Sequence, residues 1–188
     1  MGRACRIRHV HHGLAPFFCC AKAVQPERNF IMKTNILTRG AIIAALYAAL
    51  TLLLAPISYG ELQIRLSEAL TVLPVIMPEA VPALAIGCLL ANILGGCPVF
   101  DIVFGTLATL LAAVCTYLLR NRLRAAIAMP VLFNGVIVGA VVHFCYAPVM
   151  PLLLCMLLVA AGEAVSCFLI GPMVLSAVRR IPGKMLHS

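Results

Sequence analysis

The sequence predicts an all-α membrane protein, a bundle of six transmembrane helices, and three observations support this fold class. The 188 residues are 63% hydrophobic with a mean hydropathy of +1.09, whereas soluble domains are only about half apolar. Four stretches without Asp, Glu, Lys or Arg, residues 40–60, 80–100, 102–119 and 125–162, approach or exceed the roughly 20 residues that cross a bilayer. Because they lack the alternating pattern of barrel strands, we expect helices, which satisfy their own backbone in lipid.

The first three spans are each bounded by residues that start or end helices. The first is expected at residues 36–56, where a proline and a turn-prone segment close it. The second, residues 67–77, is short and contains Pro74, which removes a backbone donor and bends a helix. The third is expected to start near Pro78 or Pro82, because these prolines suit a first helical turn, and to end near Leu94.

The last three spans are expected at residues 101–119, 129–146 and 150–178. Asp101 opens the fourth span and is a typical cap for a first helical turn. The basic residues predict the topology, because the positive-inside rule places them in the cytoplasm. They form three clusters, Lys33 with Arg39, Arg120 with Arg122 and Arg124, and Arg179 with Arg180 and Lys184. We expect four spans between the first two clusters and two spans between the last two, which places both termini in the cytoplasm. The net charge of +8 therefore reflects membrane topology and not nucleic-acid binding.

Residues 1–31 are unlike the rest of the chain. They are basic, and the short apolar patch at residues 14–20 is poorly suited to a signal peptide. Met32 begins a segment typical of a start just before a first span. We therefore expect residues 1–31 to be an unstructured or mis-annotated leader and residues 32–188 to form one transmembrane domain.

Polar residues inside the apolar spans are the candidates for function. A carboxylate such as Glu163 at the centre of a bilayer costs about 2.5 kcal/mol or more, so it is a functional candidate by default. The alternative is a protonated or internally hydrogen-bonded glutamate that fixes helix packing. Asn92 and Asn134 are similar intrusions, expected to hydrogen-bond across helices with or without a ligand.

A second set of polar groups is expected near the outer half of the bundle. Arg65 and Glu68 are three residues apart, so they can pair on one helical face, and a simple surface ion pair is the alternative to a binding role. Gln63, Asp101 and His143 complete this ring. Polar groups gathered on the outer side indicate the capture of a small polar solute from outside.

The sequence also indicates what the chain lacks. It has no Ser-His-Asp order, no His-Glu-x-x-His motif and no phosphate-binding loop, and its nine cysteines include no Cys-x-x-Cys pair. We therefore expect no catalytic residue, cofactor or metal, and no means of powering transport within this chain. Ala41, Ala45 and Ala49, four residues apart, form a surface where another helix can approach closely, either inside the bundle or on a partner.

The segment QIRLSEALTVLP at residues 63–74 resembles the QueT family of queuosine-precursor transporters, which are substrate-binding S components of energy-coupling-factor (ECF) transporters. The resemblance continues through residues 87–92 and 101–110 and ends with Gly162-Glu163. It implies a six-helix bundle of the ECF S-component type that docks on a transmembrane T component driven by two cytoplasmic ATPases. In such proteins the first helix carries the docking pattern that the three alanines match.

The implied ligand is a 7-deazaguanine, either queuine or its cyano or aminomethyl precursor. A carboxylate can accept the neighbouring N–H donors of a guanine-type edge bidentately, and a cationic aminomethyl arm favours a second acid. Glu163 and either Glu68 or Asp101 could divide these tasks, while the amides read the remaining edge. The expected substrate-binding residues are Gln63, Arg65, Glu68, Asn92, Asp101, Asn134 and Glu163.

Three other functions explain fewer of these sequence features. An S component for another small nutrient, such as a vitamin, would use the same architecture. An intramembrane enzyme could use Glu163 and His143 as acid and base, but it requires a catalytic motif that the sequence does not contain. A purely structural membrane subunit leaves the gathering of polar residues on one side unexplained.

Overall fold

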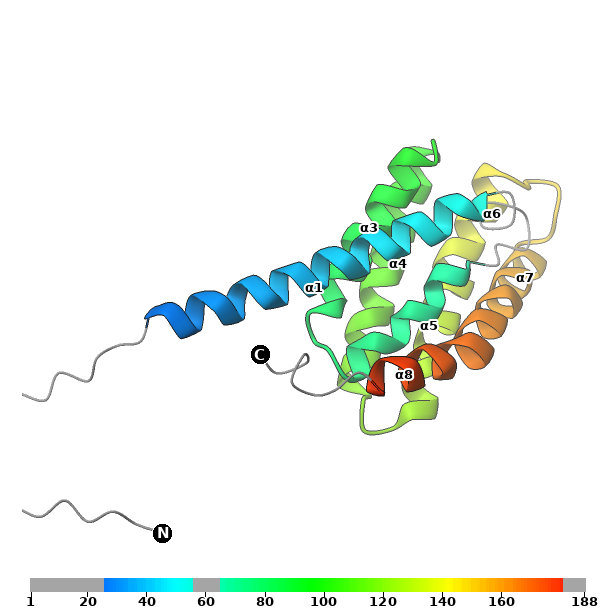
Figure 1. Ribbon diagram of the computed structural model, residues 1–188. Helices are drawn as coiled ribbons and strands as arrows, with labels where there is room; N and C mark the ends of the chain where they lie inside the picture. The colour runs from blue at the N-terminus through cyan, green and yellow to red at the C-terminus, as the bar shows by residue number, and fades with distance from the viewer. Residues whose placement is uncertain (1–25, 56–64, 181–188) are drawn as a thin grey trace, which may run out of the picture.

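The computed structural model describes residues 26–55 and 65–180, with side chains from Thr34 onward, and in these ranges all regular structure is helical (Figure 1). The elements in chain order are α1 (Pro26–Leu53), η1 (Leu66–Val75), α3 (Ala80–Leu94), α4 (Val99–Leu118), α5 (Leu123–Phe133), η2 (Asn134–Val138), α6 (Gly139–Cys145), α7 (Leu152–Ala164), η3 (Val165–Ile170) and α8 (Gly171–Arg179). Here η1 is a 3₁₀-helix, whereas η2 and η3 are π-helical segments within longer helices.

The described ranges contain six helical segments, because α5, η2 and α6 run on continuously and so do α7, η3 and α8. Four of these segments are long and apolar enough to cross a membrane: Thr34–Leu53, Val99–Leu118, Leu123–Cys145 and Leu152–Arg179. The other two, η1 and α3, are apolar but shorter. The prediction of an all-α membrane protein is confirmed. Of the expected leader, residues 1–25 lie outside the described residues, and α1 begins at Pro26, before Met32.

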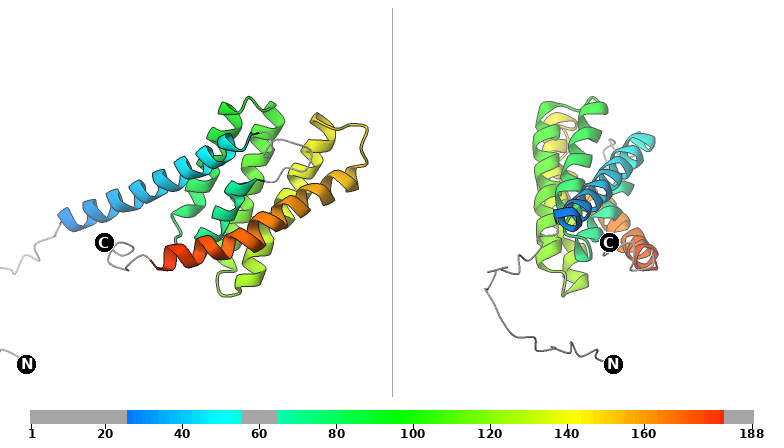
Figure 2. Two further views of the ribbon diagram at one scale, coloured as in Figure 1. Left: turned by 45° about the vertical axis from the view of Figure 1, so that its right-hand side comes forward. Right: turned by 60° about the vertical axis from the view of Figure 1, so that its left-hand side comes forward.

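The second expected span differs most from its prediction. In place of an α-helix at residues 67–77, the chain forms a 3₁₀-helix of 10 residues. At a rise of about 2.0 Å per residue this helix covers about 20 Å, where an α-helix of equal length covers about 15 Å. Every residue from Ser67 to Pro74 is buried, and η1 contacts α1, α3, α4, α5, η3 and α8. It is therefore the centre of the bundle, around which the longer helices pack (Figure 2).

Two expected helix starts are also corrected. Helix α4 begins at Val99 after Pro98, whose extended backbone makes it the residue before the first turn. Asp101 is therefore not the cap, and its side chain is fully buried inside the bundle. Helix α5 begins at Leu123 rather than at residue 129, so its first turn includes the basic residue Arg124.

Glycines allow two of the helix pairs to approach closely. A Cβ atom added at Gly87 would lie 2.8 Å from the main-chain oxygen of Ala44 on α1, and one at Gly139 would lie 2.6 Å from the Cα of Met156 on α7. Such small-residue contacts are the usual basis of helix association in lipid. By contrast, the three alanines of the first span, Ala41, Ala45 and Ala49, are exposed on α1.

The Gly139→Ala substitution should lower the thermal stability of the purified protein, since the new methyl group would overlap the backbone of α7. Overpacking of this kind costs about 1–3 kcal/mol. Gly40→Ala is the matched control, because its nearest neighbour, the Ala83 Cβ, is 3.8 Å away. Equal unfolding temperatures for the two variants in detergent would contradict the close helix crossing.

Candidate ligand-binding site

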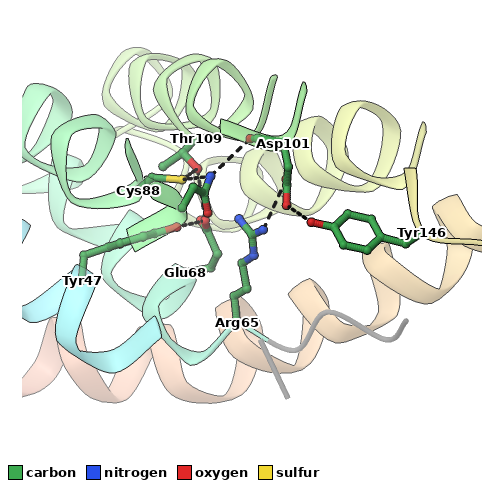
Figure 3. A network of polar contacts seen from close by, with 8 residues as sticks. Tyr47, Arg65, Glu68, Cys88, Asp101, Thr109 and Tyr146 are labelled. Atoms are coloured by element: carbon green, nitrogen blue, oxygen red, sulfur yellow. Dashed lines mark hydrogen bonds and ion pairs between the residues drawn. The ribbon is translucent and has the colours of Figure 1, made fainter. Parts of the chain in front are cut away.

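Buried polar side chains from six elements meet in the middle of the bundle, and Figure 3 shows the part of this cluster around Arg65, Glu68 and Asp101. They come from α1, η1, α3, α4, η2 and α7, and each is at most 2% exposed: Tyr47, Arg65, Glu68, Asn92, Asp101, Thr109, Asn134 and Glu163. Burying a polar or charged group in an apolar interior is unfavourable unless it is paired or hydrogen-bonded. The cluster is therefore either a satisfied network or a site that a ligand completes.

Asp101 is held from three directions. The Arg65 Nη2 atom lies 3.6 Å from Asp101 Oδ1 in a fully buried ion pair, and the Tyr146 hydroxyl donates to Asp101 Oδ2 over 3.0 Å. The Asn92 side chain donates to the main-chain oxygen of Asp101 over 3.3 Å. Because these contacts join η1, α3, α4 and the end of α6, the Asp101 carboxylate is committed to the bundle's own groups.

Glu68 is held through one of its two oxygens. Its Oε1 atom accepts hydrogen bonds from the Tyr47 hydroxyl and, over 3.2 Å, from the Thr109 hydroxyl. Its Oε2 atom is buried without a hydrogen-bond partner in the part of the chain that the structure describes. The carboxylate of Glu68 is thus fixed in orientation and leaves one oxygen available.

Glu163 and Asn134 form the other side of the cluster. The carboxamide of Asn134 interacts with both Glu68 and Glu163, but neither its oxygen nor its nitrogen makes a hydrogen bond of ordinary geometry within the described ranges. Besides its interaction with Asn134, Glu163 accepts a long contact, 4.0 Å, from the Cys167 thiol. On this side of the cluster, Glu68 Oε2 and both polar atoms of the Asn134 side chain therefore have no described hydrogen-bond partner.

The irregular helices explain how these side chains reach one place. In a 3₁₀-helix, side chains three residues apart eclipse, so Glu68 and Thr71 lie on one line along η1, and Arg65 directly precedes this helix. The two π-helical segments begin at Asn134 and two residues after Glu163. Such segments occur mostly as single turns inside α-helices and are frequent at functional sites.

Gly105 provides space one turn beyond Asp101. A Cβ atom there would lie 3.1 Å from both the Asn92 amide nitrogen and Asp101 Oδ1, and 3.9 Å from Arg65 Nη1. Unlike Gly87 and Gly139, it is approached by polar side-chain ends rather than by a neighbouring backbone.

Six of the seven residues expected to bind substrate come together in this cluster, and the seventh, Gln63, lies outside the described residues. The alternative of a surface ion pair between Arg65 and Glu68 is wrong, because both side chains are buried and Arg65 pairs across the bundle with Asp101. His143 does not join the cluster described here. Its Nδ1 atom lies 2.8 Å from the main-chain oxygen of Met150, across the α6–α7 connection.

Three hydroxyl groups of the site, those of Tyr47, Thr109 and Tyr146, were not among the residues predicted from the sequence. Thr109 carried a detectable signal, since Asp101, Gly105 and Thr109 are spaced by four residues and share one face of a helix. The sequence contains no comparable signal for Tyr47 and Tyr146, which are simply polar residues in or next to an apolar span.

Replacing Tyr47 by Phe should lower the unfolding temperature, because Glu68 then keeps only the Thr109 hydroxyl as a donor. Weakening the pairing of a buried charged group costs about 1–3 kcal/mol. Tyr117→Phe makes the same chemical change on α4, at a ring stacked on Arg120 with 4.8 Å between the Arg120 Cζ atom and the ring centre, and should have little effect. A thermal unfolding curve for Tyr47→Phe that coincides with that of the unsubstituted protein would rule out the contact.

Comparison with known proteins assigns the family. Residues 37–180 match the model of the QueT transporter family. The protein described as queuosine precursor transporter QueT from Lactococcus lactis subsp. cremoris (strain MG1363) is 37% identical over 94 residues, which are 49% of this chain and 55% of that protein. The chain thus spans about half the length of this curated relative, and no solved structure matches. Because the family match covers most of the chain, this protein belongs to the QueT transporter family, a family of membrane transporters and not of enzymes.

Proposed function

We propose that this chain is the substrate-binding membrane subunit of an ECF-type importer and that it takes up a queuosine precursor, a 7-deazaguanine. The incomplete pairing in the buried cluster carries this proposal. Glu68 Oε2, Asn92 Oδ1 and both polar atoms of the Asn134 side chain have no hydrogen-bond partner in the described ranges. Leaving such atoms unpaired in an apolar interior is costly, and a ligand rich in donors and acceptors would pair them.

A 7-deazaguanine has the complementary chemistry. Its pyrimidine edge presents two neighbouring N–H donors, which one carboxylate can accept bidentately. Glu163 suits this edge, because its described partners are the Asn134 amide and, at 4.0 Å, the Cys167 thiol, and neither forms a hydrogen bond of ordinary geometry with it. Asn92 and Asn134 offer amides for the remaining polar atoms of the ring. The relative from Lactococcus lactis, described as a queuosine precursor transporter, supports this ligand class.

The distribution of charge supports entry of the ligand from outside the cell. The α3–α4 turn and the α6–α7 connection lie at one end of the bundle, whereas the α4–α5 connection and the end of α8 lie at the other (Figures 1 and 2). The second end carries Arg120, Arg122, Arg179 and Arg180, so the positive-inside rule assigns it to the cytoplasm. Asp101 in the first turn of α4 and Tyr146 after α6 then belong to the outer half, and both termini are cytoplasmic.

An energising partner is required, because the sequence contains no phosphate-binding loop. We assign this role to a transmembrane T component with two cytoplasmic ATPases. The surface that supports docking is on α1, where Ala41, Ala45 and Ala49 are exposed while Ala44 and Ala48 face the bundle. Beside it, a groove of about 340 Å³ runs between α1 and α3. Small side chains next to a groove allow the close approach that helix association in lipid requires.

The Glu163→Gln variant should bind 7-deazaguanines about 10-fold to 100-fold more weakly, because a hydrogen bond to a charged group contributes about 1.5–3 kcal/mol. Isothermal titration of the purified protein with queuine and its two precursors measures this change. Glu79→Gln is the control, because Glu79 pairs with Arg39 at 3.8 Å and lies outside the cluster. Unchanged affinity in Glu163→Gln would refute the assignment of this residue, and binding of vitamins in place of deazaguanines would indicate an S component for another nutrient.

Replacing the exposed Ala45 by Leu should reduce uptake of labelled queuine in cells that contain the T component, while binding by the purified protein stays unchanged. The larger side chain would keep a partner helix away from α1 without reaching the cluster. Ala161→Leu, at an exposed alanine on α7, is the matched control and should transport normally. If the two variants transport equally well, the docking surface lies elsewhere.

A further inference from the structure

The buried cluster contains more acids than bases. Among the described residues it holds three carboxyl groups, those of Glu68, Asp101 and Glu163, and one cation, Arg65, all at most 2% exposed. Arg65 forms its described ion pair with Asp101. No described ion pair involves Glu68 or Glu163, so three acids share the charge of the single described cation, Arg65.

Two carboxyl groups in this position need compensation. Glu68 and Glu163 interact with each other through their charges, and like charges disfavour ionisation of both groups. An ionised carboxylate inside a bilayer is also unfavourable unless it is paired. A cation supplied by the ligand would stabilise the ionised form of both acids.

A second observation indicates where that cation would bind. The Asn134 side chain is 2% exposed and interacts with both acids, yet its polar atoms have no hydrogen-bond partner in the described part of the chain. Next to it, Glu68 Oε2 is also unpaired. An ammonium group has three donors and no acceptor, so these two oxygens suit it.

The contacts of Glu68, Asp101 and Glu163 indicate which of them can bind which part of the ligand. Asp101 is occupied by Arg65 and Tyr146. Glu68 has a single available oxygen, because Tyr47 and Thr109 hold the other, and one oxygen cannot accept a guanine-type edge bidentately. Glu163 interacts with the Asn134 amide and contacts the Cys167 thiol at 4.0 Å. No hydroxyl group among the described residues holds its carboxylate, which suits it to that edge.

We infer that Glu68, together with Asn134, forms an ammonium subsite, so that the transporter selects 7-deazaguanines whose 7-substituent carries a protonated amine. This inference rests on the proposed function and deepens it by naming the substrate class. An aminomethyl group and the secondary amine of queuine are cationic near neutral pH, whereas a cyano group is neutral. A neutral substituent would leave Glu68 and Glu163 without the cation that stabilises them.

The test compares ligands with the same ring. Purified protein is titrated with 7-aminomethyl-7-deazaguanine, with its neutral analogue 7-hydroxymethyl-7-deazaguanine and with the cyano compound. The aminomethyl ligand should bind about 10-fold tighter or more than the hydroxymethyl ligand, as expected when a charged hydrogen bond replaces a neutral one. Equal affinities, or a preference for the neutral ligands, would overturn the inference while the proposed function stands. Failure to bind any of the three would refute the proposed function itself.

Two variants test whether Glu68 or Glu163 distinguishes the aminomethyl ligand from the hydroxymethyl ligand. Glu68→Gln keeps an oxygen for Tyr47 and Thr109 but removes the charge, so the ratio of the two affinities should fall to about one while the hydroxymethyl ligand still binds. Glu163→Gln should weaken both ligands and preserve their ratio. The opposite pattern would assign the ammonium to Glu163. Should Glu68→Gln fail to fold, the ratio measured on the unsubstituted protein decides the inference alone.

Discussion

The burial of charge on η1 is the constraint on which the rest of the structure depends. A 3₁₀-helix that carries Glu68 and follows directly on Arg65 lies at the centre of an apolar bundle, and neither side chain reaches water. Each therefore needs partners from other helices, and the described contacts of Tyr47, Asp101 and Thr109 supply them. These partners specify how α1 and α4 face the centre of the bundle.

The close packing of the helices and the buried polar cluster depend on each other in this bundle. Small residues such as Gly87 and Gly139 bring helices near enough for short polar side chains to meet. The described contacts of Asp101 with Arg65 and Tyr146 join separate parts of the bundle, whereas Glu68 Oε2 and the Asn134 side chain have no described hydrogen-bond partner. One half of the cluster thus holds the helices together, while the other half retains capacity for a solute.

Most of the fold and the membership of the site could be predicted from the sequence, because uncharged stretches and isolated polar residues are visible in one dimension. Glu163, Asn92 and Asn134 each interrupt an apolar span and all reach the cluster. The pairing of Arg65 with Asp101 could not be predicted, since it depends on how two helices are rotated. The 3₁₀ form of η1 was also hidden, because its apolar residues are equally compatible with an α-helix.

The π-helical segment at Asn134–Val138 bears on how related chains are aligned. A π turn contains one residue more than the α turn it replaces, so its loss shortens a helix by a single position without breaking it. All side chains on one side of that point would then rotate by about 100°, the angle between successive residues of an α-helix. A one-residue gap here in a homologous sequence therefore signals a differently lined interior and not a trivial variation in length.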